Sequence, residues 1–254
     1  MVTRIYPGTS DFENLSALRT ESSEEANDFD YAGVIVPKPW GEEYLWFQNS
    51  SVAIWMLHLK PGCGTSLHCH ARKRTSLIVM QGRILCSTID DRYHLTEGQA
   101  VVLEPCVFHS SKAVSEDDVF LMEVETPPLK GDLLRCTDTF GRAGKAYESS
   151  SQYSTDLERY DYQPLGSIPH GGGIFDFKGV SLRYSSFRGK LDFHNGLLPG
   201  GVSVPLLGRM VFGKQTVADI GEAITSSEIP LESCPESIPP VELLQILPSH
   251  PYHS

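Results

Sequence analysis

The sequence predicts an all-β fold, and three observations support this class. Short apolar runs follow one another between Val34 and about Pro127. Turn signals such as KPG, TEG and SEDD separate these runs. No helical period competes with the runs in this part of the chain. Several short strands at regular spacing are typical of a β-barrel or a β-sandwich.

The first 33 residues are expected to form an N-terminal arm, because the segment ESSEEANDFD is polar and acidic and has no apolar stripe. A short helix is expected within the arm at residues 12–18. The barrel itself is expected to span residues 34–128. Its strands are predicted at six apolar runs, namely EYLWF (43–47), SVAIWMLHL (51–59), TSLIVM (75–80), RILCSTI (83–89), AVVLE (100–104) and VFLMEVE (119–125).

Residues 129–254 are expected to form an irregular C-terminal extension that contains β-structure and packs on the barrel or on a partner subunit. Its strands are predicted at GIFDF (173–177), VSLRYSSF (180–187) and SVPLLGRMVFG (203–213). A brief helix is predicted at VADIGEAI (217–224), and VELLQIL (241–247) is predicted to be a short helix or arm. No repeat of fixed period occurs, which favours one barrel over two.

The composition excludes several functional classes. The chain has 254 residues, a formal net charge of −11 and scattered basic residues, so neither nucleic acid nor an anionic membrane is an expected partner. No apolar run approaches the roughly 20 residues that span a bilayer, and no apolar stretch follows a basic start. A cytoplasmic location is expected. The six cysteines are expected to be reduced, and no C-x-x-C pair suggests a structural zinc module.

The stretch GCGTSLHCHARKR contains two histidines two positions apart. Alternate residues of a strand point to the same face, so His68 and His70 would project together, about 7 Å apart at the backbone. This spacing suits chelation of one metal ion. A third ligand must come from another strand, and His109, which follows Gly98 and the run AVVLE, is the best candidate.

This arrangement resembles the cupin superfamily. The motif positions that match are Gly62, His68, His70 and Gly82 in the first cupin motif, and Gly98 and His109 in the second. The segment KPWGEEYLWF, at residues 38–47, is similar to the first strand of cupins of the mannose-6-phosphate isomerase and mannose-1-phosphate guanylyltransferase type. The resemblance covers about residues 37–125. It implies a jelly-roll-like cupin barrel with a metal site at His68, His70 and His109.

The sequence departs from the cupin motifs at the ligand glutamate. Thr75 occupies that position, with Arg74 as the alternative, and neither side chain is a carboxylate. Three neutral histidines suit Fe(II), Zn(II), Mn(II) or Ni(II) better than Mg(II), which prefers oxygen ligands. A carboxylate from another strand is a further possibility, with Glu123 preferred over Glu125 and Glu104.

The remaining candidates concern the substrate. Glu123 or Glu104 is expected to serve as the catalytic base. The basic trio of Arg72, Lys73 and Arg74 would hold a phosphate or carboxylate at the mouth of a metal pocket, with a solvated turn as the alternative. Two further residues are included as substrate-binding candidates, Thr75 because of its motif position and Arg83 because it begins a strand after Gly82.

Three functions are compatible with these residues. The first is a metal-dependent cupin enzyme that acts on a small polar anionic molecule, such as a sugar phosphate or nucleotide sugar, by Lewis-acid isomerase or epimerase chemistry. The second is a three-histidine non-haem Fe(II) dioxygenase, for which the missing glutamate is an argument in favour. The third is a non-catalytic ligand-binding cupin. A homodimer is expected in each case, because subunit pairing can cover an exposed sheet.

Overall fold

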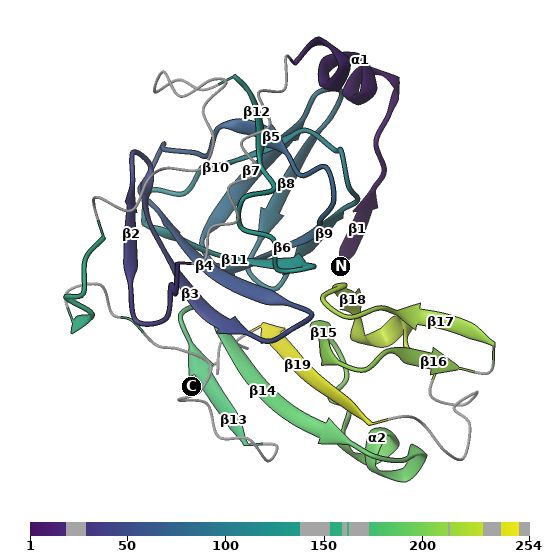
Figure 1. Cartoon of the computed structure of the whole chain (residues 1–254). Helices are drawn as coiled ribbons and strands as arrows, with labels where there is room; N and C mark the ends of the chain where they lie inside the picture. Colours follow the sequence, from purple (N-terminus) through teal and green to yellow (C-terminus); the bar gives the residue numbers. More distant parts are fainter. Residues whose placement is uncertain are drawn as a thin grey trace.

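Four sheets make up most of the fold (Figure 1). A computed structural model describes residues 1–18, 29–137, 153–158, 162, 173–212, 214–230 and 240–248. The largest sheet has seven strands in the order β1 (Val2–Ile5), β9 (Ala100–Leu103), β6 (Arg74–Gln81), β11 (Val119–Thr126), β4 (Ala53–Leu59), β3 (Gly41–Gln48) and β2 (Ile35–Lys38). The sheet that faces it has five strands in the order β12 (Leu134–Thr137), β5 (Leu67–Cys69), β10 (His109–Ala113), β7 (Arg83–Thr88) and β8 (Arg92–Thr96).

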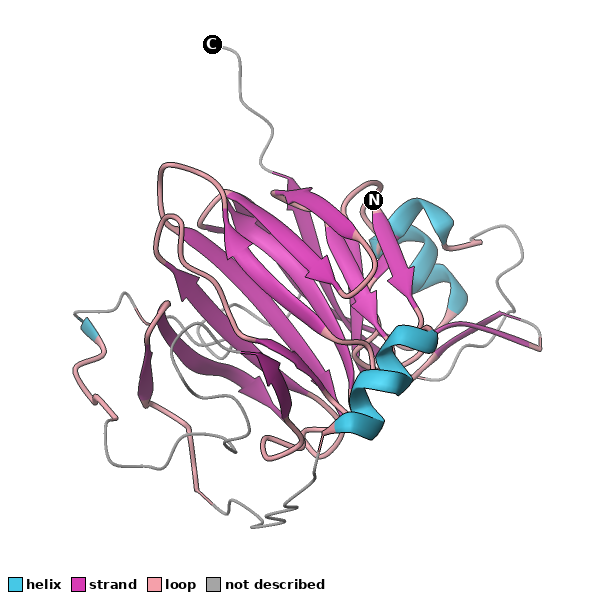
Figure 2. Ribbon diagram, turned by 90° about the horizontal axis from the view of Figure 1, so that it is seen from above, coloured by secondary structure: helices cyan, strands magenta, loops and turns pink. Residues whose placement is uncertain are grey.

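Two smaller sheets follow in the C-terminal part. One orders its strands as β13 (Ile174–Phe177), β14 (Val180–Phe187), β19 (Val241–Pro248), β15 (Val202–Leu207) and β18 (Ile224–Thr225). The other is a hairpin of β16 (Met210–Phe212) and β17 (Gln215–Ala218). Helical segments lie at the periphery of the strand layers (Figure 2), and they are α1 (Thr9–Ala17), α2 (Lys190–Gly196) and the 3-10 turn η3 (Ser226–Glu228).

The all-β fold that the sequence predicts is confirmed, with two sheets that face each other. Each of the six apolar runs predicted as strands contains one, from β3 through β11. The apolar residues between the sheets form the inner core, to which β4, β6 and β11 contribute Leu57, Leu77 and Leu121. The inner core holds the five-stranded sheet, on which the candidate histidines lie, against the seven-stranded sheet.

A second apolar core covers the opposite face of the seven-stranded sheet. Successive side chains of a strand point to opposite faces, so Met122 of β11 leaves the inner core and packs with residues of the third sheet such as Leu182 and Leu244. The central strands of the seven-stranded sheet, β4, β6, β9 and β11, are therefore buried on both faces, which explains why they are mostly apolar. The division of the chain into an N-terminal arm, a barrel and a C-terminal extension stays a prediction.

Two C-terminal predictions were wrong. The segment VELLQIL is strand β19, paired with β14 on one side and β15 on the other, and not a helix or arm. Because both edges of β19 are paired within this chain, it offers no free edge to a second subunit. The segment VADIGEAI contains the end of β17, a turn and the start of β18 instead of a helix. The homodimer stays a prediction.

The N-terminal residues are more regular than an arm. Strand β1 adds to the seven-stranded sheet in parallel with β9, and α1 follows it at the position where a helix was expected. Gly41, in the Pro-Trp-Gly segment, has a φ of 146°, and a Cβ there would collide with the backbone oxygen of His58. Glycine is thus required for the close pairing of β3 with β4.

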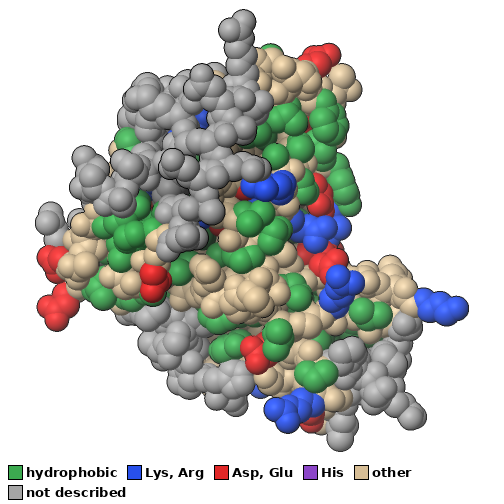
Figure 3. All heavy atoms as spheres, in the orientation of Figure 1, with side chains coloured by type: hydrophobic (Ala, Val, Ile, Leu, Met, Phe, Trp, Pro, Cys, Tyr) green, Lys and Arg blue, Asp and Glu red, His purple; other side chains and the backbone are tan. Residues whose placement is uncertain are grey.

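On the face shown in Figure 3, basic and acidic side chains lie close together and do not form a continuous basic surface. Among the residues that the structure describes, no helix has the length and apolar character needed to cross a membrane.

Candidate metal centre

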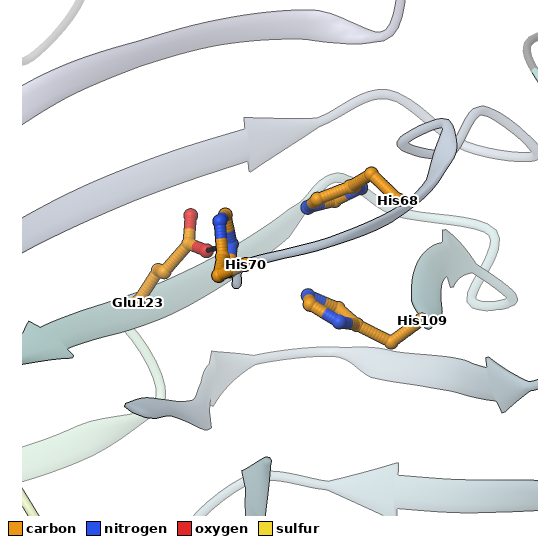
Figure 4. A group of neighbouring side chains, drawn as sticks. All are labelled: His68, His70, His109 and Glu123. Carbon is orange, nitrogen blue, oxygen red and sulfur yellow. Dashed lines mark ion pairs between the residues drawn. The ribbon is translucent and has the colours of Figure 1, made fainter. Parts of the chain in front are cut away.

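Three histidines come together at the end of the five-stranded sheet. His68 lies on β5, His70 directly follows it, and His109 begins β10 as the register partner of His68. The ring centroids are 4.5 Å apart for His68 and His109, 5.1 Å for His68 and His70, and 5.5 Å for His70 and His109. Figure 4 shows the three rings converging, with Glu123 of β11 beside His70. Strand β5 therefore brings His68 and His70 together, and the register of β10 with β5 brings His109 beside them.

Each imidazole donates its Nδ1–H to a backbone carbonyl oxygen. The distances are 2.8 Å from His68 to Ser66, 2.5 Å from His70 to Asp132 and 3.0 Å from His109 to Val107. Because Nδ1 carries the proton, Nε2 of each ring keeps a lone pair. Such outer hydrogen bonds fix the ring orientation in metal-binding histidines.

The three imidazoles are neutral at physiological pH. Burial is the main cause that lowers the pKa of His70 to about 4 and that of His109 to about 4, and it holds the pKa of His68 well below its usual range. The neighbouring imidazoles add to this effect at His68 and His109, and Lys73 adds to it at His70. Neutral imidazole is the form that binds metals.

Glu123 adds a carboxylate to the histidines. Its Oε1 lies 3.7 Å from Nε2 of His70, and one potential ligand atom from each of the four residues lies within 4.8 Å of the others. Nε2 of His70 and Nε2 of His109 are buried and have no hydrogen-bond partner among the residues that the structure describes. Buried acceptors without a partner destabilise a protein unless something binds them. The group therefore fits a divalent transition ion with nitrogen and oxygen ligands.

A pocket of about 60 Å³ opens beside the histidines. Besides His68, His70 and Glu123, its charged lining residues are Lys38, Glu43, Lys73, Glu125, Lys130 and Arg135. Lys73 Nζ lies 2.5 Å from Glu125 Oε1, and Lys130 Nζ lies 2.8 Å from Glu43 Oε1. Lys130 also lies over the ring of Trp55, 3.2 Å from its centroid. The pocket is thus a buried and highly charged environment.

The structure separates two of the predicted site residues from this pocket. The Nε of Arg74 donates to Glu104 at 3.0 Å, and its Nη1 lies 3.3 Å from Glu222, which precedes β18 of the third sheet. Arg4 of β1 is ion-paired with the same two carboxylates. Neither Arg74 nor Glu104 lines the pocket. Instead, Arg74 and Arg4 connect the seven-stranded sheet to the C-terminal part through Glu222.

The other substrate-binding candidates also lie outside the pocket lining. The side chain of Arg72 is 59% exposed and lies 3.7 Å from Asp132. Arg83 is exposed at the start of β7. Thr75 is buried on β6 opposite Glu125, and its hydroxyl has no hydrogen-bond partner among the described residues. Their roles in substrate binding stay predictions, and the geometry does not favour them.

Sequence reasoning gave no role to Arg135 and Asp132, and it assigned Lys73 and Glu125 to other roles than their buried ion pair. Lys73 is 1% exposed although it lies between two arginines in a sequence typical of a solvated turn. Glu125 was considered only as a possible metal ligand, and Arg135 and Asp132 lie in a segment that matches no motif. The alternation of Glu123 and Glu125 on one strand face was the one available signal.

Comparison with protein families supports the cupin resemblance of this part of the chain. Residues 55–125 match the family model described as "Cupin domain". No curated protein matches the chain.

Three solved structures illustrate the structural likeness. A KdgF protein from a Halomonas species is 19% identical, with 35% of this chain and 82% of that chain covered and a TM-score of 0.34. A sugar phosphate isomerase of the cupin superfamily from Silicibacter pomeroyi is 13% identical, with 34% and 58% covered and a TM-score of 0.32. An oxalate oxidase is 18% identical, with 32% and 44% covered and a TM-score of 0.30. Likeness at this level carries no inference about the reaction.

Proposed function

We propose, from the premise that residues 55–125 are a domain of the cupin superfamily, that this protein is a metal-dependent enzyme for a small polar anionic substrate. His68, His70, His109 and Glu123 would hold one divalent transition ion, with Fe(II), Zn(II), Mn(II) and Ni(II) as the candidates. When bound, such an ion supplies Lewis-acid chemistry at a ligand oxygen. Isomerase or epimerase chemistry is the reaction type that we favour.

The observation that carries this proposal is the pair of buried, unpartnered Nε2 atoms of His70 and His109. Both rings are neutral and held by their Nδ1 hydrogen bonds, so both lone pairs are available to a ligand. A purely structural pair would leave two acceptors unsatisfied in a buried site, which is unfavourable. A bound ion removes that cost.

The carboxylate of Glu123 bears on the choice between the two enzymatic functions. The dioxygenase interpretation rested on a site with histidine ligands alone, whereas Glu123 brings a negative charge to the same group. A carboxylate ligand would compensate part of the charge of a divalent ion. For this reason we rank Lewis-acid chemistry ahead of three-histidine dioxygenase chemistry.

The pocket residues would serve the substrate. Four basic side chains line the pocket, and an anionic molecule would be attracted to them and to the ion. The low exposure of Lys73 and Glu125 indicates that water has little access to this side of the pocket. Charge interactions there are stronger than at the surface.

Elemental analysis of protein purified without added metal tests the proposal. We expect about one transition-metal ion per chain. His68→Ala, His70→Ala and His109→Ala should each lose the ion, whereas His94→Ala, at an exposed position of β8, should retain it. Wild-type protein that remains metal-free after incubation with each candidate ion would contradict the proposal.

A second measurement addresses the reaction class. Oxygen uptake is recorded for the iron-loaded and the zinc-loaded protein with candidate sugar phosphates and small hydroxy acids. Turnover without oxygen consumption is the expected result. Oxygen uptake that depends on iron and substrate would favour the dioxygenase, and metal-independent binding with no turnover would favour a ligand-binding cupin.

A further inference from the structure

The pocket beside the metal centre contains a buried ion pair that the metal ligands do not need. Lys73 and Glu125 contact each other through Nζ and Oε1 at 2.5 Å, and their side chains are 1% and 3% exposed. Lys73 directly precedes β6 and Glu125 is near the end of β11, so the pairing of these two strands brings the charges together. Both residues line the pocket.

One oxygen of this ion pair lacks a partner. Glu125 Oε2 is buried and accepts no hydrogen bond from any described residue. A buried carboxylate oxygen is costly to leave unsatisfied, because a charged acceptor loses its water without replacement. The pocket wall therefore presents an acceptor that a ligand with an O–H or N–H donor would satisfy.

The charge of the pocket defines the rest of the ligand. Four cationic and three anionic side chains line it, so a divalent ion at the histidines would leave a net charge of +3. A neutral ligand would leave that charge uncompensated in a buried site. Arg135 lies directly opposite His68 in the pairing of β12 with β5, so its side chain extends on the same face as the histidine. Its planar guanidinium suits a carboxylate in bidentate geometry.

We propose that this pocket binds a small hydroxy acid, whose hydroxyl donates to Glu125 Oε2 and whose carboxylate binds Arg135. The inference deepens the proposed function and rests on it. A volume of about 60 Å³ admits a ligand of a few non-hydrogen atoms. A phosphoryl group is disfavoured beside Glu125, because the dianion of a phosphate ester has no donor on its phosphoryl oxygens and is repelled by Glu43 more strongly than a singly charged carboxylate is.

Calorimetric titration of the metal-loaded protein with three matched probes tests the proposal. Lactate carries a hydroxyl and a carboxylate, propionate lacks the hydroxyl, and 1,2-propanediol lacks the acid. We expect lactate to bind about ten- to hundredfold more tightly than propionate, because a hydrogen bond to a charged acceptor is added. The diol should bind more weakly than either acid.

Two variants assign the contacts. In Glu125→Gln the ratio of lactate to propionate affinity should fall to about one. In Arg135→Gln both acids should weaken by about tenfold or more while lactate keeps its advantage. Glu43→Gln is the matched control, since Glu43 is also a pocket carboxylate paired with a lysine, and it should keep the wild-type ratio.

Chelation of the ion by lactate has to be separated from the contact with Glu125. The titrations are therefore repeated on protein stripped of metal, in which the advantage of lactate should persist in the wild type and vanish in Glu125→Gln. Metal content and thermal unfolding of each variant are measured alongside, so that a folding defect is recognised.

The outcomes separate this inference from the proposed function. Equal affinity for lactate and propionate, no measurable lactate binding, or an advantage of lactate that survives Glu125→Gln would overturn the inference. Tighter binding of inorganic phosphate than of lactate would replace the hydroxy acid with a phosphate ligand. A full metal content with any of these results leaves the metal centre intact, whereas absence of metal contradicts the proposed function itself.

Discussion

The backbone carbonyl of Asp132 accepts a hydrogen bond from Nδ1 of His70 at 2.5 Å. The carboxylate of the same residue accepts hydrogen bonds from the backbone N–H groups of the turn at 71–73, at 3.2, 2.8 and 3.0 Å. Asp132 thus orients one candidate ligand through its main chain and holds the turn behind that ligand through its side chain. It lies outside residues 55–125, the range of the cupin domain.

Replacement of Asp132 by alanine should weaken metal binding. The turn that follows His70 loses three hydrogen bonds, so the imidazole is less well positioned, and loss of an outer contact typically costs about 10- to 100-fold in metal affinity. The free energy of unfolding should fall by about 2–3 kcal/mol. Chelator competition and urea unfolding measure the two effects. Asp219→Ala, which removes an exposed ion pair with Arg209, is the control, and equal metal affinities in both variants would contradict this role.

Glu123 and Glu125 occupy the same face of β11, yet we expect different effects on the metal. Glu123→Gln should lower metal affinity by about tenfold or more, because a neutral amide replaces a charged oxygen ligand. Glu125→Gln should leave metal affinity near the wild-type value, because Glu125 contacts Lys73 and not the histidine cluster. Competition titration with a chelator compares the two variants directly. The reverse ranking would assign the fourth ligand to Glu125.

Arg74 should matter for stability and not for ligand affinity. Arg74→Gln breaks its contacts with Glu104 and Glu222, and we expect a loss of about 1–3 kcal/mol in the free energy of unfolding. Arg72→Gln changes a side chain that is 59% exposed, so its effect should stay within about 0.5 kcal/mol. Chemical denaturation gives both values. A tenfold loss of lactate affinity in Arg74→Gln would restore Arg74 as a substrate-binding residue.

His58 should make stability depend on pH. Its Nδ1 contacts Glu42 and its Nε2 lies 2.8 Å from Asp118, and these carboxylates, Glu42 foremost, raise its pKa above 6.5. A raised pKa in the folded state stabilises the protein fully below pH 6.5, and this contribution is lost as the pH rises through the folded pKa.

The variant His58→Gln tests this dependence. It should destabilise the protein by about 1–2 kcal/mol at about pH 5.5 and by less at about pH 8.5, where the imidazole is less charged. Urea unfolding at the two pH values provides the comparison. Equal destabilisation at both would show that stacking of His58 on Phe120, at 4.5 Å between ring centroids, is the main contribution.

The sequence predicted the cupin strands well because each is an apolar run bounded by turn residues. β4 and β6 are such runs, buried on both faces. Strand β19 was missed because VELLQIL fits a buried strand and an amphipathic helix equally well, and only its pairing with β14 and β15 decides between them. Strand β1 was missed because four residues in a polar context carry too little pattern.

The three histidines were predictable because they lie at fixed distances in sequence from the glycines of the two cupin motifs. Arg135 was not predictable, because it reaches the pocket through the pairing of β12 with β5. The burial of Lys73 against Glu125 was not predictable either, because it depends on the pairing of β6 with β11. Arg74 was assigned to the substrate for the opposite reason. It is close to the metal ligands in sequence, but successive residues of a strand point to opposite faces, and the Arg74 side chain points away from the pocket.

Strand β11 separates the metal centre from the C-terminal sheet by a single layer of backbone. Its inward residues continue to Glu123 and Glu125, whereas Phe120, Met122 and Val124 pack in the outer core with the third sheet. We expect sequence variation among related chains to follow this division. Across related chains, substitutions at Phe120, Met122 and Val124 should covary with the apolar positions of β14, β15 and β19. The two glutamates should vary independently of the C-terminal sheet, although they alternate with those residues along the same strand.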